Sequence, residues 1–148
     1  MIIRKAEVKD LSTIVEYNFN LAYETEDKEL NKDILTKGVK RILEDSTKGI
    51  YHVCEIEGKV VGQIMYTYEW SDWRNGTFIW VQSVYVNKEF RGKGVFKALY
   101  NKVKEICDSN DEYVGIRLYV EKENFTAQKT YKKLGMEECN YFMYEYEK

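Results

Sequence analysis

The stretch Val84-Tyr85-Val86-Asn87-Lys88-Glu89-Phe90-Arg91-Gly92-Lys93-Gly94-Val95-Phe96 runs from an apolar, β-prone segment through a basic turn into an amphipathic helix. Backbone N–H groups at such a turn and in the first turn of a helix have no intrahelical acceptor, so they can bind an anion. Gly92 and Gly94 allow a phosphate to approach the backbone without meeting a Cβ atom. Arg91 and Lys93 add positive charge on either side of Gly92. The stretch therefore predicts a phosphate site where the strand meets the helix.

The helix that follows the turn has one apolar face. Its apolar residues recur at helical spacing, as expected for packing against a core; they are Val95, Phe96, Leu99, Tyr100, Val103, Ile106 and Cys107. A dinucleotide-binding loop is excluded because Lys97 stands where a third glycine is required, and a P-loop is excluded because its Gly-Lys-Ser/Thr ending is absent. On this segment alone, an ordinary strand–helix turn remains the alternative to a phosphate site.

Length and composition indicate one soluble domain. The chain has 148 residues, of which 44% are hydrophobic and 32% charged, so we expect a single globular domain over residues 1–148. No run of residues approaches the roughly 18 apolar positions of a membrane span, so no membrane association is expected. The net charge is -2, which gives no reason to expect nucleic-acid binding.

The three cysteines suggest neither a metal site nor a disulfide framework. Cys54, Cys107 and Cys139 are odd in number, far apart and without metal-ligand spacing. His52 and Cys54 share one face of a strand, which would permit a catalytic pair, but a buried structural cysteine is the favoured interpretation. The N-terminus, Met1 to Glu7, has the charged pattern of a strand and not that of a secretory signal, so we expect a cytoplasmic protein.

Hydrophobic periodicity divides the chain into alternating strands and helices. Strands are expected at Ile2 to Arg4, Ile50 to Ile56, Val60 to Trp70, Phe78 to Val86 and Val114 to Val120, with one or two more between Met136 and Tyr146. Helices are expected from Asp10 to about Tyr23, through Ile34 to Leu43, from Val95 to about Asp108, and from Asn124 to Leu134 with Gly135 as the stop.

This order of elements predicts an α/β fold. The early strands should pair as antiparallel hairpins, whereas the strand–helix–strand unit from Phe78 to Val120 should place its two strands parallel. The expected result is a mixed, largely antiparallel, twisted sheet of six to seven strands with helices on both faces.

The order of elements and two motifs resemble the GCN5-related N-acetyltransferase (GNAT) superfamily over essentially the whole chain. The first motif is a strand followed by Q/R-x-x-G-x-G/A, here Glu89-Phe90-Arg91-Gly92-Lys93-Gly94, in which only Glu89 departs from the pattern. The second is N-x-x-A-x-x-x-Y-x-x-x-G, matched by Asn124, Ala127, Tyr131 and Gly135. Taken alone, Tyr131 would also fit a core-facing aromatic residue.

The resemblance implies binding of acetyl-coenzyme A between the ends of two parallel strands, at Val86 and Val120. It assigns the pyrophosphate to the turn and helix start made of Arg91, Gly92, Lys93, Gly94, Val95 and Phe96. Backbone groups at Val84, Tyr85 and Val86, together with Asn124, would contact the pantetheine arm. Tyr131 would protonate the departing thiolate, and no metal is implied.

The resemblance also implies direct attack of an amine on the thioester. An alkylamine has a pKa near ~10.4, so a group must remove its proton. Many family members use a glutamate on the fourth strand, but Phe78 to Ser83 contains no carboxylate. The candidates for the base are Glu69 and Asp72 near the end of the third strand, and Glu24 and Glu26 in the loop after the first helix. Each of these is also explained as a solvated surface charge.

Aromatic residues crowd the hairpin between the third and fourth strands: Tyr66, Tyr68, Trp70, Trp73 and Trp80. They fit cross-strand packing, a surface between two copies in a homodimer, or a pocket for a cationic amine. The leading hypothesis is an acetyl-CoA-dependent N-acetyltransferase that acts on a primary amine of a small molecule. The alternatives are an enzyme that acetylates a protein or peptide, and a non-catalytic acyl-CoA sensor.

Overall fold

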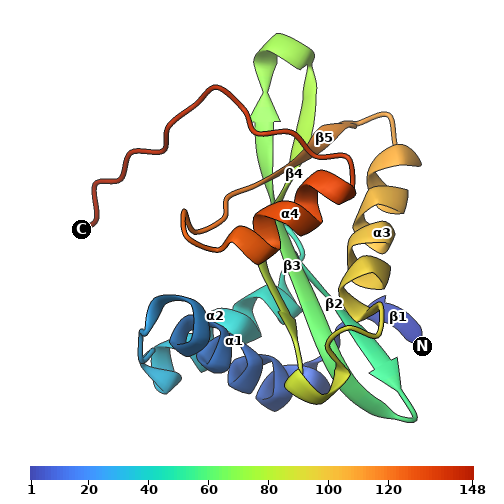
Figure 1. Cartoon of the computed structure of the whole chain (residues 1–148), viewed down its shortest axis with the longest axis vertical. Helices are drawn as coiled ribbons and strands as arrows, with labels where there is room; N and C mark the ends of the chain where they lie inside the picture. The colour runs from blue at the N-terminus through green and yellow to red at the C-terminus, as the bar shows by residue number, and fades with distance from the viewer.

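The computed structural model describes residues 1–148 and builds them around one sheet of five strands, in the order β1-β2-β3-β4-β5 (Figure 1). The strands are β1 (Ile2–Lys5), β2 (Ile50–Ile56), β3 (Lys59–Ser71), β4 (Gly76–Val86) and β5 (Tyr113–Leu118). Neighbours pair antiparallel from β1 to β4, whereas β4 and β5 pair parallel. The expected mixed, largely antiparallel sheet is confirmed, with five strands in place of six to seven.

Helices cover both faces of the sheet, as expected (Figure 1). On one face, α1 (Leu11–Glu26) and α2 (Lys32–Glu44) pack over a core that includes Ile14, Val39 and Val53. On the other face, α3 (Val95–Asp108) packs Val95, Leu99 and Val103 onto a second core, which includes Ile64 and Ile79. The apolar stripe that the sequence predicts for α3 is therefore its buried face. A short helix, α4 (Phe125–Lys133), follows β5 and buries none of its residues.

Three-residue 3₁₀ turns complete the described elements: η1 (Val8–Asp10), η2 (Asp72–Arg74) and η3 (Lys88–Phe90). None of the helices is both long enough and apolar enough to cross a membrane. The glycine predicted to stop the last helix does so: Gly135 has φ +88°, and the Met136 N–H donates to the Tyr131 carbonyl.

The first helix is longer than the sequence indicates. It runs on through Glu24 and Glu26 and ends where Asp27 adopts a left-handed conformation, with φ of 51°. Glu24 and Glu26 thus lie in the last turn of α1 and not in a loop. Polar residues near a helix end do not break the helix, because the last turn faces solvent and needs no apolar residues for packing.

The expected strands between Met136 and Tyr146 are wrong for this structure, which has no helix or strand after α4. Instead, the chain beyond Gly135 runs off from the body in an extended path (Figure 1). No backbone hydrogen bond joins residues 137–148 to any strand. A β-prone segment becomes a strand only when another strand supplies the ladder, and none does so here.

Candidate active site

The sheet opens between β4 and β5. Their pairing runs from Thr77 opposite Tyr113 to Val81 opposite Leu118, and there it stops. Strand β4 continues to Val86 with β3 on one side only. The backbone at Val84, Tyr85 and Val86, predicted to face a ligand, lies along this open stretch. An unpaired stretch of strand can accept another extended chain as a partner.

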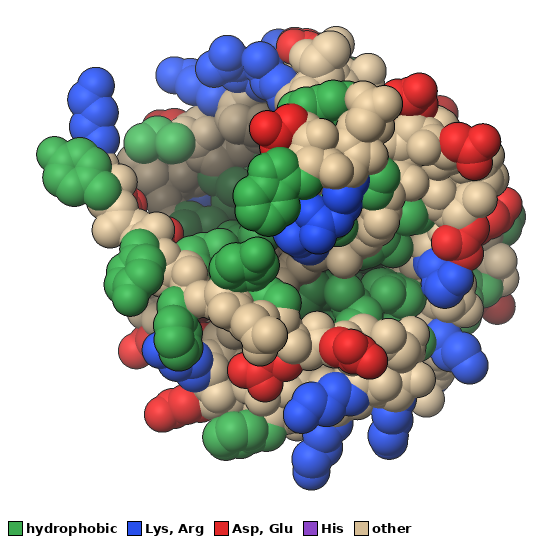
Figure 2. Space-filling view, turned by 90° about the horizontal axis from the view of Figure 1, so that it is seen from above, with side chains coloured by type: hydrophobic (Ala, Val, Ile, Leu, Met, Phe, Trp, Pro, Cys, Tyr) green, Lys and Arg blue, Asp and Glu red, His purple; other side chains and the backbone are tan.

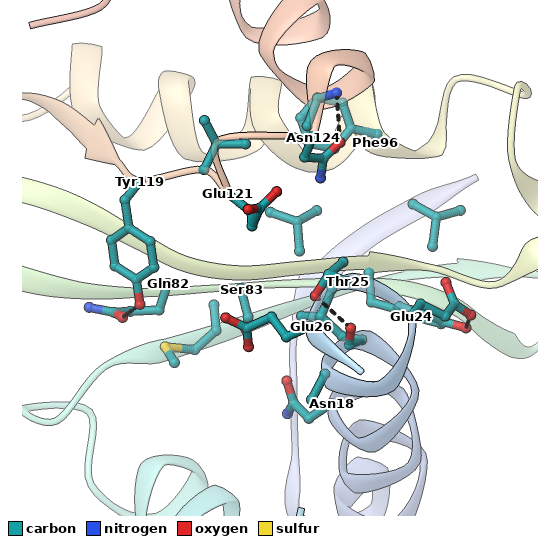
Figure 3. Close-up of a pocket in the computed structure, with 18 of the residues that line it drawn as sticks. Asn18, Glu24, Thr25, Glu26, Gln82, Ser83, Phe96, Tyr119, Glu121 and Asn124 are labelled. Carbon is teal, nitrogen blue, oxygen red and sulfur yellow. Dashed lines mark hydrogen bonds between the residues drawn. The ribbon is translucent and has the colours of Figure 1, made fainter. Parts of the chain in front are cut away.

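A β-bulge marks the point where the two strands separate. Met65 pairs with Ser83 and Tyr66 with Val81, so Gln82 has no residue opposite it on β3. The Gln82 side chain donates to Thr67 Oγ1 at 3.0 Å and accepts from the Tyr119 hydroxyl at 3.3 Å (Figure 3). Gln82 thereby bridges β3 and the chain just beyond β5, at the mouth of the opening.

The basic turn presents free N–H groups to the same opening. Gly92 and Gly94 have φ of 75° and 81°, and a Cβ atom on either would meet nothing within 4 Å. Only a residue without a Cβ adopts this conformation without strain. Gly94 is also the N-cap of α3, and no side chain caps the helix there. The first N–H groups of α3 therefore remain available to an anion.

Arg91 is held in place at the edge of the turn by two oxygen atoms. Its Nε donates to the Val86 carbonyl at 2.9 Å, and its Nη2 donates to Glu24 Oε2 at 2.7 Å. Burial alone would raise the pKa of Glu24, but the hydrogen bond and charge of Arg91 bring the pKa of this carboxyl below its usual value. Glu24 is therefore an anion that occupies the guanidinium of Arg91.

Helix α4 supplies the opposite wall. The Asn124 side chain accepts from the Ala127 N–H at 3.2 Å and so caps the start of the helix. The ring of Tyr131 packs edge-on against Phe96 of α3, with 5.8 Å between ring centroids. Burial raises the pKa of the Tyr131 phenol, so this group stays protonated through neutral pH.

One cavity of about 1250 Å³ joins these features. Its lining includes most of the residues predicted from the sequence: Glu26, Val84, Tyr85, Val86, Arg91, Gly92, Gly94, Val95, Phe96, Asn124 and Tyr131. Glu24 also lines it. Lys93 does not; its ammonium lies 5.0 Å from the centroid of the Phe90 ring.

Glu69 and Asp72 lie apart from this cavity. The Glu69 carboxylate accepts from Arg117 at 2.6 Å, and neither acidic residue belongs to the lining. Of the four acidic residues considered as bases, the structure brings only Glu24 and Glu26 to the cavity. Their side chains diverge there. Glu24 points towards the basic turn, whereas Glu26 reaches towards the part where Gln82, Ser83 and Tyr119 lie (Figure 3).

The far end of the cavity lies between α1, α2 and the sheet, and it is mainly apolar. Its walls include Leu21, Ala22, Leu35, Val39, Ile42 and Met65, beside the carboxylate of Glu26. Gln82, Tyr119 and Glu121 also line the cavity, although no motif in the sequence singles them out. A signal for the last two was present: both lie within three residues of the carboxyl end of β5, a strand of the parallel pair, and ligands bind at that edge in open α/β sheets.

Comparison with known proteins gives matches of two kinds. The sequence model described as "Acetyltransferase (GNAT) family" matches residues 14–136. The solved structure of a possible acetyltransferase from Clostridium difficile 630 is 62% identical, with a TM-score of 0.94, and the alignment covers 99% of this chain and 96% of that one.

Two curated relatives match part of the chain. An uncharacterized N-acetyltransferase of Methanocaldococcus jannaschii is 34% identical over 89 residues, which are 60% of this chain and 39% of that protein. A thialysine N-epsilon-acetyltransferase of Bos taurus is 33% identical over 79 residues, or 53% of this chain and 45% of that protein. The matched part thus spans less than half the length of each. Because the family model covers both the glycine turn and Tyr131, the chain belongs to the GNAT acetyltransferase family.

Proposed function

We propose that this protein transfers an acetyl group from acetyl-CoA to a primary amine of a small molecule. The observation that carries the proposal is the single cavity that runs from the basic turn, past Tyr131, to Glu26. One end offers N–H groups and Arg91 for a pyrophosphate, and the middle offers the open edge of β4 for the amides of a pantetheine arm. Bound there, acetyl-CoA supplies an activated thioester.

The residues of the chain divide the proton transfers between them. Glu26 accepts a proton from the ammonium of the acceptor, because only the neutral amine is a nucleophile. The amine nitrogen forms the new C–N bond as the C–S bond breaks. Tyr131, protonated because burial raises its pKa, donates its proton to the departing thiolate, and the proton that the acylated nitrogen then loses restores the phenol. We assign the base to Glu26 and not to Glu69, because Arg117 holds the Glu69 carboxylate outside the cavity.

The far end of the cavity supports a small amine with an apolar body. Glu26 and Glu121 supply negative charge at the cavity, and the side chains of α1 and α2 supply apolar walls. A cation with a hydrocarbon portion matches both properties. The curated relative named for thialysine acts, by its name, on the side-chain amine of a small amino-acid analogue, which is the same class of acceptor.

The test is release of free thiol from acetyl-CoA across a panel of amines, with Glu26→Gln beside the wild type. We expect turnover with at least one small primary amine, and a loss of about 100-fold or more in kcat for the variant, because general-base catalysis contributes at least that much. Glu29→Gln is the matched control, since Glu29 is exposed and lies outside the cavity lining. Equal turnover by Glu26→Gln and wild type would remove Glu26 from the mechanism.

One observation favours a second candidate function, a non-catalytic acyl-CoA sensor. The bulge of β4 carries the amide of Gln82 and no carboxylate, and both of its polar atoms are already engaged by Thr67 and Tyr119. The same assay separates the two functions. Tight binding of CoA with no acceptor-dependent thiol release, across both amines and peptides, would establish the sensor. Turnover with peptides alone would move the acceptor to a protein.

A further inference from the structure

A group of uncharged polar side chains lies in the otherwise apolar far end of the cavity. It consists of Asn18 on α1, Tyr51 on β2 and Ser83 on β4, and all three line the cavity. Seen from above, the molecule is hollowed, with apolar side chains inside the hollow (Figure 2). Asn18 and Tyr51 are deeply placed, with exposed fractions of 8% and 4%. We call these three residues the polar patch.

The hydrogen bonds of the polar patch are incomplete within the chain. Asn18 donates from Nδ2 to the hydroxyl oxygen of Tyr51 at 2.9 Å, but its own carbonyl oxygen accepts no hydrogen bond. The Oγ atom of Ser83 is buried and has no hydrogen-bond partner. Ser83 nevertheless lies near enough to the Tyr51 hydroxyl to oppose the rise in pKa that burial causes there. Polar atoms buried in native proteins nearly always have a partner, so this group of side chains is unusual.

Two neighbouring hydroxyl groups cannot satisfy both of their protons by bonding to each other. If one donates to the oxygen of the other, the second O–H still needs an acceptor. Tyr51 does not escape by ionising, because burial raises its pKa and keeps the phenol protonated. The polar patch therefore presents at least one donor, from Tyr51 or Ser83, and one acceptor, the Asn18 carbonyl oxygen, to the molecule that fills this end of the cavity.

The polar patch and Glu26 lie along the same face of α1. Asn18, Ala22 and Glu26 follow at intervals of four residues, and all three line the cavity. Two turns of helix separate Asn18 from Glu26, about 12 Å along the axis. Figure 3 shows the side chains of Asn18, Glu26 and Ser83 on the same side of α1. An acceptor with its amine at Glu26 can therefore reach the polar patch with the other end of its apolar body.

The polar patch suits an uncharged group of the ligand. A buried carboxylate requires a cation beside it, and the cations that line the cavity, Lys28, Arg91 and Lys97, are all exposed. A second ammonium group would use acceptors only and leave the free O–H without a partner. A hydroxyl or a primary amide both donates and accepts, and so matches the two kinds of group that the patch presents.

We infer that the polar patch binds a hydroxyl or carboxamide group of the acceptor, at the end remote from its amine. Tyr51, Ser83 and Asn18 are then residues that determine specificity, and the acceptor is a small amino alcohol or amino amide. The inference rests on the proposed function, since it takes the amine to bind at Glu26.

The test compares the alkylamines from butylamine to octylamine with the ω-amino alcohol and ω-amino amide of each length. The measurement is kcat/KM for release of thiol from acetyl-CoA. At the length that fits, we expect the hydroxyl or amide compound to be preferred about 10- to 100-fold, mainly through KM, because the alkylamine leaves buried polar groups unpaired. Tyr51→Phe removes one hydroxyl and keeps the ring, so the preference should fall to about 3-fold or less. Asn18→Leu should have the same effect.

Tyr17→Phe is the matched control. Tyr17 is also a buried tyrosine, at 5% exposed, but its hydroxyl donates to the Val60 carbonyl at 2.7 Å and the residue does not line the cavity. This variant should keep the preference of the wild type. A preference is a ratio of two values from one preparation, so it does not depend on the fraction of the protein that is folded. A destabilised variant therefore still gives a valid answer.

Calorimetric titration of the CoA-bound protein with the same compounds separates this inference from the proposed function. Binding that prefers the amino alcohol or amino amide, with no turnover, would support the polar patch and contradict the enzymatic proposal. Turnover at equal kcat/KM for an alkylamine and its two polar counterparts would overturn the inference and leave the enzymatic proposal intact. A preference for ω-amino acids, or one that persists in both Tyr51→Phe and Asn18→Leu, would also overturn the inference. No binding by any compound would contradict both.

Discussion

Tyr131 combines a position beside Phe96 in the cavity with a pKa that burial raises above the usual value for tyrosine. The raised pKa means that the phenol keeps its proton as the pH rises, so its capacity to donate persists beyond pH 10. We expect kcat to show no loss on the alkaline side below about pH 10. For Tyr131→Phe we expect kcat to fall about 100-fold, the scale of general-acid catalysis, with little change in CoA affinity.

Steady-state rates from pH 7 to 10, and titration of the variant with CoA, check this expectation. Tyr23→Phe is the matched control, because Tyr23 is exposed on α1 and does not line the cavity. A variant with unchanged kcat would make Tyr131 a packing residue, the other interpretation that its sequence permits.

His52 gives the protein an acid sensitivity of its own. It is 7% exposed, its Nδ1 has no hydrogen-bond partner, and its ring stacks on Tyr66 at 5.9 Å. Burial, with lesser contributions from Lys102 and Lys5, lowers its pKa from 6.5 to about 4. Between those values the unfolded chain binds a proton that the folded chain excludes, so stability falls as the pH drops from 6.5 to 4, by about 3 kcal/mol.

Urea unfolding at pH 7, 5.5 and 4 measures this loss, and His52→Leu should flatten the profile over that range. The pair of Asp10 and Arg4 acts in a different window. The hydrogen bond from Arg4 lowers the pKa of Asp10 below 3.8. The stability that this pair contributes is therefore lost only below that pH, in the wild type and in His52→Leu alike. The same slope in His52→Leu as in the wild type would assign the acid sensitivity to other groups.

At the level of residues, the sequence predicts those site residues that belong to a motif with fixed spacing. The glycine turn follows from its own residues, whereas Asn124 and Tyr131 follow from the motif of the family that the sequence resembles, and all of these except Lys93 line the cavity. The base is harder to predict, because an isolated carboxylate has no pattern. Glu26 and Glu69 looked equivalent in sequence, and only the ion pair with Arg117 and the direction of α1 separate them.

Among the elements, the start of α3 depends on a close approach to β3. A Cβ atom on Gly62 would lie 2.9 Å from Val95 Cγ1, 3.1 Å from the Tyr85 carbonyl and 3.3 Å from Leu99 Cδ1. Gly62→Ala should therefore push the first turn of α3 away from the sheet. We expect a loss of about 1–3 kcal/mol in unfolding free energy, the usual range for overpacking, and weaker CoA binding.

Denaturant unfolding and CoA titration measure the two effects. Gly38→Ala in α2 is the matched control, because no atom lies within 4 Å of the added Cβ. There the better helix former should stabilise the protein by about 0.5–1 kcal/mol. Two alanine variants with equal stability would show that the contact between α3 and β3 adapts without strain.

Elements with a clear periodicity of apolar residues were predicted well, whereas elements whose bounds depend on pairing with another strand were not. Strand β2 and helix α3 have the expected bounds because their apolar patterns face their own cores. Strand β5 stops at Leu118 and not at Val120, because β4 turns away there. The segment after Gly135 has a strand pattern, but no strand of this chain pairs with it.

For the whole molecule, the cavity is lined by elements from both faces of the sheet. Its lining comes from α1, α2, β4, α3 and α4, so a ligand that fills it connects both faces of the sheet. We expect CoA at 100 times its Kd to add about 2.7 kcal/mol to stability. For a chain of this size, that raises Tm by about 5 to 10 °C.

Differential scanning fluorimetry with increasing CoA checks this shift. Arg91→Ala should shift the response to higher CoA concentrations, because the turn then keeps its N–H groups but loses the guanidinium. Lys59→Ala, on an exposed end of β3 away from the cavity, should respond as the wild type does. A Tm that does not change with CoA concentration would contradict the binding of CoA in this cavity.

At this scale, the fold class and the family follow from the order of elements, whereas the number of strands does not. The sequence predicts six to seven strands because it contains that many β-prone segments. The structure has five, since pairing is a property of two segments and cannot be read from either one alone.

The ion pair between Arg91 and Glu24 has a kinetic consequence. Glu24 and Glu26 share the last turn of α1, so an incoming pyrophosphate that draws Arg91 from Glu24 removes a positive charge beside this turn and leaves Glu24 with Tyr85 and Lys88 as its partners. We therefore expect a compulsory order of addition, with the acyl donor first. An unreactive acceptor analogue should then inhibit uncompetitively against acetyl-CoA, whereas mixed inhibition would show that the analogue also binds the free enzyme and would contradict a compulsory order. The Glu24 carboxylate would thus make binding of the acceptor depend on prior binding of acetyl-CoA.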